Sequence, residues 1–119
     1  MNKFSDEELI AKFKEGDRPS YTELVNRYKD KIINFIYRFM GDLSASEDLA
    51  QETFIKVYIQ KDSYREIAKF STWLYTIAGN LAKTELRKIK RRKTYSVSAL
   101  SKNEREFIIR DSSIDVNEK

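Results

Sequence analysis

Cysteine and histidine are both absent from the 119 residues of this chain. Without cysteine the protein can form no disulfide and can use no thiolate chemistry. Without histidine it also lacks the usual acid–base residue at neutral pH and the commonest zinc ligand. No pair of carboxylates accompanies a nucleophile, a metal-binding spacing or a glycine-rich phosphate loop. We therefore expect a protein that is not an enzyme and that holds neither a metal nor a cofactor.

Glycine and proline are scarce as well, with three residues and one residue respectively. Because strands need turn residues at short intervals, this scarcity favours helices. The length suits one domain with a single core. The N-terminus turns acidic at once, and no apolar run approaches the length that spans a bilayer. We expect an all-α, compact bundle of about four helices in the cytoplasm, without membrane insertion.

Capping signals and apolar spacing predict where these helices lie. Serine stands three residues before glutamate, the spacing of a capping box, at three expected starts: Ser5 with Glu8, Ser20 with Glu23 and Ser44 with Glu47. Gly16 and Gly41 mark the ends of the first two helices. Residues 60–69 are polar and irregular, which predicts a loop or a frayed helix before a fourth helix that starts at Ser71.

Apolar residues recur at every third or fourth position within each predicted helix, which gives each helix one face toward the core. The expected core positions are Leu9, Ile10, Phe13, Leu24, Val25, Tyr28, Ile32, Phe35, Ile36, Phe39, Ala50, Phe54, Val57, Tyr58, Trp73, Leu74, Ile77, Leu81 and Leu86. Gly79 interrupts the fourth helix at a cost of up to about 1 kcal/mol relative to alanine, which indicates close packing or the approach of a ligand. After Lys93 the periodicity fades, and residues 94–119 are expected to form a flexible linker or tail.

Positive charge is concentrated at the end of the fourth predicted helix. Residues 83–93 hold seven lysines or arginines and one glutamate, whereas residues 1–82 hold twelve basic and thirteen acidic side chains. Cations at a helix C-terminus complement the helix dipole, but this explains two or three of them rather than seven. Contact with nucleic acid is therefore favoured over a merely solvated face.

Aromatic residues precede this basic end. Tyr64, Phe70, Trp73 and Tyr75 cluster around the loop and the start of the fourth helix, where rings could stack on unpaired bases. The alternative is that these rings belong to the core, and partial burial is expected for two of them, Phe70 and Trp73. Polar and basic positions follow at Asn80, Lys83, Thr84 and Arg87. Amide and hydroxyl groups can read base edges while cations bind phosphates, so this surface suits single-stranded or melted DNA.

A second informative face lies on the third predicted helix. Asp48, Gln51, Glu52 and Ile55 follow the i, i+3, i+4, i+7 spacing and therefore share one side of the helix. A solvated surface is the alternative interpretation. However, a glutamine stands between the two carboxylates where a lysine would pair better, and an isoleucine extends the same face. Such a mixture fits a protein surface that receives arginine-rich helices.

Two sequence motifs carry a resemblance to a known family. The segment SEDLAQETFIKVY, followed by FSTWLYTIAGNLAKTELRKIKRR, resembles region 2 of bacterial extracytoplasmic-function (ECF) sigma factors, and the likeness covers residues 5–93. The resemblance implies a helical domain that docks on RNA polymerase and recognises and helps to melt the −10 promoter element. It implies RNA polymerase core, promoter DNA and an anti-sigma factor as partners.

The resemblance also assigns roles to residues. Asp48, Gln51 and Glu52, extended by Ile55, match the motif that binds the clamp helices of the largest polymerase subunit. The loop 61–70 matches the segment that captures an extruded base of the non-template strand. The expected DNA-binding residues are Tyr64, Lys69, Phe70, Ser71, Thr72, Trp73, Tyr75, Asn80, Lys83, Thr84, Arg87, Lys88, Arg91 and Arg92.

The chain departs from the family pattern in two respects. Gly79 stands where the family usually has a basic residue, and no segment matches the second family domain, which reads the −35 element. We thus expect a region 2 domain at 1–93 and an interdomain linker at 94–119. The chain would then be either a piece of a longer protein or a one-domain relative, and the first alternative is favoured. The alternative function is a stand-alone interaction module that an anti-sigma factor sequesters or that competes for polymerase.

Overall fold

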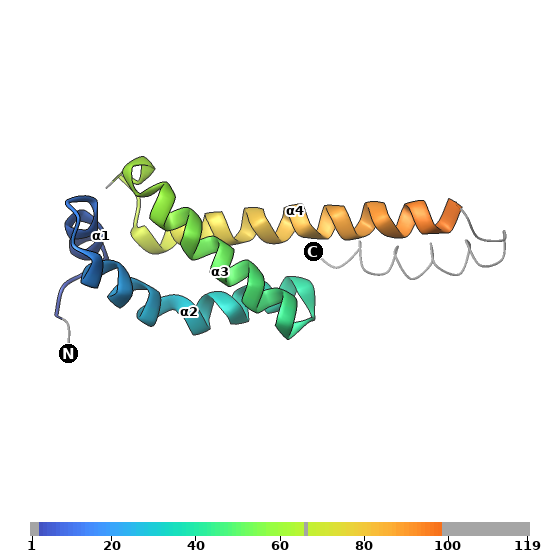
Figure 1. Ribbon diagram of the computed structural model, residues 1–119, viewed down its shortest axis with the longest axis horizontal. Coiled ribbons are helices and arrows are strands. Elements are labelled where there is room, and N and C mark those ends of the chain that lie inside the picture. Colours follow the sequence, from blue (N-terminus) through green and yellow to red (C-terminus); the bar gives the residue numbers. More distant parts are fainter. Residues whose placement is uncertain (1–2, 66, 99–119) are drawn as a thin grey trace. The chain divides into compact units, whose positions relative to one another are not determined.

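The computed structural model describes residues 3–65 and 67–98 (Figure 1). The elements in chain order are α1 (Asp6–Lys14), α2 (Arg18–Met40), α3 (Leu43–Ile59), the short 3-10 helix η1 (Lys61–Ser63) and α4 (Phe70–Ser98). Within this described part every regular element is helical, which confirms the expected all-α class. None of these helices is both long enough and apolar enough to cross a membrane.

The chain divides into two units, residues 1–83 and 84–119, and α4 continues from the first into the second. Each unit is described by itself below. Helix α4 ends at Ser98 rather than at Lys93, so helical structure extends into the start of the expected linker. The rest of that expected linker lies outside the described residues.

The first predicted capping box is confirmed. Ser5 is the N-cap of α1: its Oγ accepts a hydrogen bond from the backbone N–H of Glu8 at 3.1 Å, and its own N–H donates to Glu8 Oε1 at 2.8 Å. These two bonds satisfy amide groups that have no partner within the helix. Gly16, which follows the helix, has a φ of 103°, a conformation that favours glycine.

The other two predicted capping boxes, Ser20 with Glu23 and Ser44 with Glu47, are wrong. An aspartate precedes each serine and takes the N-cap position first. Asp17 precedes α2 and accepts a hydrogen bond from the hydroxyl of Ser20, which is buried inside the helix. Asp42 precedes α3 and accepts from the backbone N–H of Ala45 at 3.3 Å. Both helices still begin within a few residues of the predicted starts.

All four α-helices contribute to the core of residues 1–83, and α1 and α3 both pack against α2 (Figure 1). The buried apolar residues are Leu9, Ile10, Phe13, Leu24, Ile32, Ile36, Leu49, Ala50, Phe54, Val57, Tyr64, Phe70, Leu74, Ala78 and Ala82. On α4 the buried stripe repeats every fourth residue and includes Ala78 and Ala82, whereas the predicted Trp73, Ile77 and Leu81 are half-buried. The prediction favoured large side chains, but alanines let a helix approach its neighbours closely.

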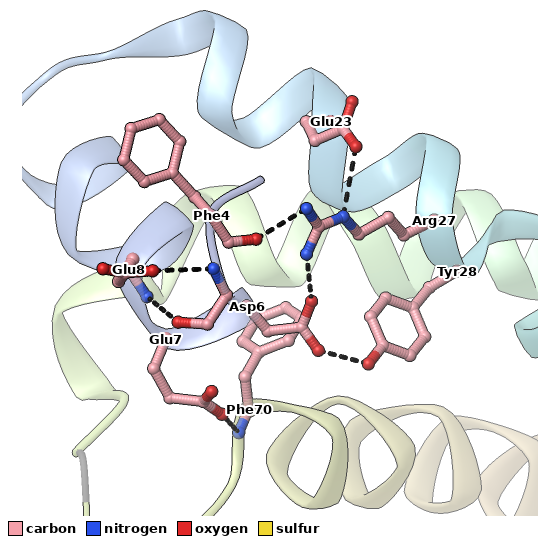
Figure 2. Close-up of polar contacts among 9 residues, drawn as sticks. Phe4, Asp6, Glu7, Glu8, Glu23, Arg27, Tyr28 and Phe70 are labelled. Carbon is pink, nitrogen blue, oxygen red and sulfur yellow. Dashed lines mark hydrogen bonds and ion pairs between the residues drawn. The ribbon is translucent and has the colours of Figure 1, made fainter. Parts of the chain in front are cut away.

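A polar network joins the N-terminal segment to α2 (Figure 2). The Asp6 carboxylate accepts hydrogen bonds from Arg27 at 2.9 Å and from the hydroxyl of Tyr28. Arg27 also pairs with Glu23 at 3.1 Å and donates to the carbonyl of Phe4 at 2.7 Å. Burial raises the pKa of Tyr28, and its hydrogen bond to Asp6 raises it further, so the hydroxyl stays a donor. The network fixes the start of α1 on α2.

Candidate protein and nucleic-acid interfaces

The outer face of α3 carries the four residues expected to bind protein. Asp48, Gln51, Glu52 and Ile55 are all exposed, opposite the buried stripe of the same helix. Among the described residues neither Asp48 nor Glu52 has an ion-pair partner. Ile59 lies one turn beyond Ile55 and is 71% exposed, which adds an apolar position that the sequence interpretation missed. The sequence contained an indication of this position, because a residue four places after Ile55 lies on the same side of the helix.

A groove of about 710 Å³ runs beside this face, between α2 and α3. Its lining consists of Tyr21, Val25, Lys29, Ile33, Glu47, Asp48, Ala50, Gln51, Phe54 and Ile55. The buried or half-buried members are apolar or aromatic, whereas the exposed members include one lysine and two carboxylates. The hydroxyl of Tyr21 donates to the carbonyl of Phe54 at 2.8 Å and ties the two walls together. An apolar floor with a charged rim suits an amphipathic helix of a partner.

The aromatic residues at the start of α4 are mostly structural. Tyr64 and Phe70 are 1% and 0% exposed, and their ring centroids lie 6.0 Å apart. Phe70 also packs edge-on against Tyr28 of α2 at 6.0 Å. The expectation that these two rings stack directly on bases therefore disagrees with their burial, because rings of this size contribute most when they fill a core. Trp73 and Tyr75 are half-buried.

The segment between η1 and α4 presents a different set of groups to solvent. Ile67 is 93% exposed, and Arg65, Ala68 and Lys69 are also exposed. Of these, only Lys69 was among the expected DNA-binding residues. The exposure of Ile67 could not be predicted from the sequence, since a single apolar residue in a polar segment has no periodicity to place it.

Both ends of this segment are bonded to α1. Lys14 Nζ donates to the backbone carbonyl of Tyr64 at 2.6 Å. At the other end the backbone N–H of Phe70 donates to Glu7 Oε2 at 2.8 Å (Figure 2). Neither contact could be read from local spacing, because the partners are 50 and 63 residues apart in the chain.

The first part of α4 exposes a polar stripe without any carboxylate. Thr72, Thr76, Asn80 and Lys83 are exposed, and no acidic residue occurs between residues 67 and 84. Thr76 was not among the expected residues, although it lies one turn from Thr72 and from Asn80. Its hydroxyl donates to the carbonyl of Thr72 at 2.8 Å. Ser71 is half-buried. This stripe offers hydroxyl, amide and ammonium groups to one side.

In the second unit the described part of α4 exposes mainly cations. Thr84, Arg87, Lys88, Lys90, Arg91, Arg92 and Lys93 are all exposed. Arg87 donates to the hydroxyl of Thr84 at 3.3 Å. Among the side chains described from residue 84 to residue 94, Arg92 is the one cation with a carboxylate partner, Glu85 at 3.6 Å. The other cations of this stretch have no carboxylate partner among the residues that the structure describes, so they suit phosphate binding.

Comparison with known proteins identifies this helical domain as a sigma-factor domain. Residues 24–92 match the Sigma-70 region 2 family, and the chain belongs to this family. It is 46% identical over 81 residues to the ECF RNA polymerase sigma factor SigW of Bacillus subtilis. It is 39% identical over 84 residues to the ECF RNA polymerase sigma-E factor of Escherichia coli. These matches cover 68% and 69% of this chain but 43% and 42% of the relatives.

A solved structure agrees with the fold. The NMR structure of an engineered region 2 of sigmaE in complex with GTAAAA has a TM-score of 0.69 and 38% sequence identity to this chain. The match covers 77% of this chain and 97% of that one. The predicted fold class and the family resemblance are therefore confirmed.

Proposed function

We propose that this chain is the part of an ECF sigma factor that docks on RNA polymerase and recognises the −10 promoter element. The observation that carries the proposal is the likeness, at 38% identity over 77% of the chain, to a region 2 domain solved in complex with GTAAAA. In this proposal residues 1–93 form the binding domain, and it acts in the bacterial cytoplasm without a catalytic step of its own.

The polar stripe of α4 supports DNA recognition. Asn80 carries both a donor and an acceptor and can bond to the edge of an unpaired base, while Lys83 binds the backbone. The absence of acidic residues between 67 and 84 removes the repulsion that phosphates would otherwise meet. The exposed cations from Arg87 to Lys93 add affinity that does not depend on sequence. We assign base reading to the stripe and phosphate binding to the basic end.

The outer face of α3 and the adjoining groove support polymerase binding. The exposed carboxylates of Asp48 and Glu52 suit bidentate bonds to arginines, and Ile55 and Ile59 provide apolar anchors. We propose that the clamp helices of the largest polymerase subunit lie here. An anti-sigma factor that covers either surface remains a prediction from the family resemblance.

A strand-preference experiment tests the proposal. Fluorescence anisotropy would compare the DNA strand GTAAAA with the scrambled strand AAGATA at about 50 mM and about 200 mM salt. We expect tighter binding of GTAAAA and a steep loss of affinity for both strands at the higher salt. Equal affinity for the two strands would contradict base recognition and leave only general attraction to nucleic acid.

A further inference from the structure

Helix α1 lies before residues 24–92, the part of the chain that matches the family. It nevertheless makes hydrogen bonds at both ends of the segment between η1 and α4. Two charged side chains on α1, Glu7 and Lys14, make these contacts. Both bond to backbone atoms: Lys14 to the carbonyl of Tyr64, where the segment begins, and Glu7 to the N–H of Phe70, directly after the segment. The position of that backbone therefore depends on α1.

We propose that Glu7 and Lys14 are positioning residues, which hold this segment in the conformation that recognises a base. The inference rests on the proposed function above. It assigns to α1 a role in DNA recognition that requires no contact between α1 and DNA.

Glu7 determines where α4 begins. Phe70 is the first residue of α4, so its N–H has no partner inside the helix. A carboxylate is the favoured acceptor at this position, since it opposes the positive end of the helix dipole and forms a charge-assisted bond. The ring of Phe70 is buried, which fixes the same residue from its other side. Lys69, directly before it, is thereby held at the exposed surface.

Lys14 restrains the opposite end. Its Nζ bonds to the carbonyl of Tyr64 and lies 5.5 Å from the centroid of the same residue's ring. The hydroxyl of Tyr64 in turn donates to the carbonyl of Ala68 at 2.6 Å. Lys14, Tyr64 and Ala68 thus form a chain of contacts across the segment. Ile67, next to Ala68, is held outward at 93% exposure.

A segment held in this way loses less conformational freedom when it binds a ligand than a free loop would. Sequence-specific binding gains from this restraint because it requires defined positions. The attraction of the basic end for phosphates does not depend on such defined positions. Loss of either tether should therefore lower the preference for GTAAAA over AAGATA and leave the affinity for AAGATA unchanged.

The experiment uses the whole chain and two variants that remove a tether, Glu7→Ala and Lys14→Met. Glu15→Ala and Lys12→Met remove the same charges elsewhere on or beside α1 and serve as matched controls. Glu7→Gln and Lys14→Arg keep a hydrogen-bonding group and should restore most of the preference. We expect the affinity ratio of the two strands to fall about fivefold in the tether variants and to stay unchanged in the controls.

Backbone amide hydrogen exchange at Ala68, Lys69 and Phe70, measured without DNA, separates positioning from overall stability. Exchange should accelerate in the tether variants at a temperature well below every thermal midpoint. Glu7 and Lys14 are both half-buried and act at opposite ends of the segment, so either variant alone tests the inference if the other does not fold.

The strand preference of the unchanged protein distinguishes a failure of this inference from a failure of the proposed function. If the unchanged protein prefers GTAAAA and both tether variants keep the full preference, this inference alone is overturned. A fall of equal size in the control variants overturns it as well. Equal binding of both strands by the unchanged protein overturns the proposed function and this inference with it.

Discussion

The outer faces of α3 and of the first part of α4 both lie on helices whose opposite sides pack into the core of residues 1–83. Their exposed residues nevertheless differ in kind. On α3 two carboxylates without an ion-pair partner in the described part of the chain, Asp48 and Glu52, stand beside Ile55 and Ile59. On α4 the exposed positions are threonines, an asparagine and a lysine, in a stretch without acidic residues.

This difference indicates the kind of partner for each face. Carboxylates repel phosphates and attract arginines, and exposed isoleucines gain from burial against an apolar surface. Hydroxyl and amide groups can bond to base edges, and ammonium groups attract phosphates. We therefore propose that one small domain carries a surface for protein and a surface for DNA, which differ in chemistry rather than in secondary structure. Substitutions confined to one face should leave binding at the other face intact.

The largest effect is expected from charge reversal on α3. Asp48→Arg combined with Glu52→Arg should lower capture by polymerase clamp helices about 100-fold, because arginines would then face arginines. A pull-down or calorimetric titration with the isolated clamp-helix segment measures this loss. Binding of GTAAAA should not decrease.

The matched control for this reversal carries Glu15→Arg and Asp30→Arg, which change the net charge by the same amount at exposed positions outside the groove lining. Its capture by the clamp helices should be close to that of the unchanged chain. If both double variants lose capture equally, the effect is one of net charge, and the assignment of the α3 face is wrong.

Asn80→Ala should have the next largest effect, on α4. Loss of the amide is expected to reduce the preference for GTAAAA over AAGATA about tenfold, roughly 1.4 kcal/mol. Asn34→Ala removes an exposed amide from α2 and is the control. Capture by clamp helices should be unchanged in both. A retained strand preference in Asn80→Ala would place base reading elsewhere, with the segment around Ile67 as the next candidate.

A smaller and less specific effect is expected at the basic end. Lys88→Gln with Arg91→Gln should weaken the binding of both strands by a similar factor. It should also reduce the salt slope, the dependence of log affinity on log salt concentration, by about 0.7 for each cation that binds a phosphate. Lys31→Gln with Arg38→Gln removes the same charge from exposed positions of α2. An equal change in this control would mean that net charge, rather than the basic end of α4, governs the attraction.

The sequence was sufficient for some features that depend on one helix, although two of the three capping boxes were wrong. The α3 face was predicted correctly as an exposed face because four residues at helical spacing share a side whatever surrounds them. Partial burial of Phe70 was expected, but its complete burial depends on packing against Tyr28 of α2. The burial of Tyr64 was not predicted, since it follows from packing against Phe70 and Trp73. The groove needs two helices, and the tethers from α1 join residues far apart in the chain. Such contacts leave no periodic signal in the sequence.

The smallest effect, and one that sharpens the comparison, concerns Gly79 on α4. A Cβ built at this position would lie 3.9 Å from the ring of Phe35, an ordinary van der Waals distance, and the backbone there needs no positive φ. Close packing therefore does not require this glycine. Gly79→Ala should raise the free energy of unfolding by about 0.5–1 kcal/mol, measured by urea denaturation, and leave both kinds of binding unchanged.

Gly79→Arg then isolates the effect of charge at the position where the family resemblance leads us to expect a basic residue. Relative to Gly79→Ala it should bind both strands a few-fold more tightly and raise the salt slope by about 0.7, as one added phosphate contact would. An increased preference for GTAAAA would instead show that the position takes part in base reading. A lower stability of Gly79→Ala than of the unchanged chain would contradict this expectation and would mean that the added Cβ does not fit beside Phe35.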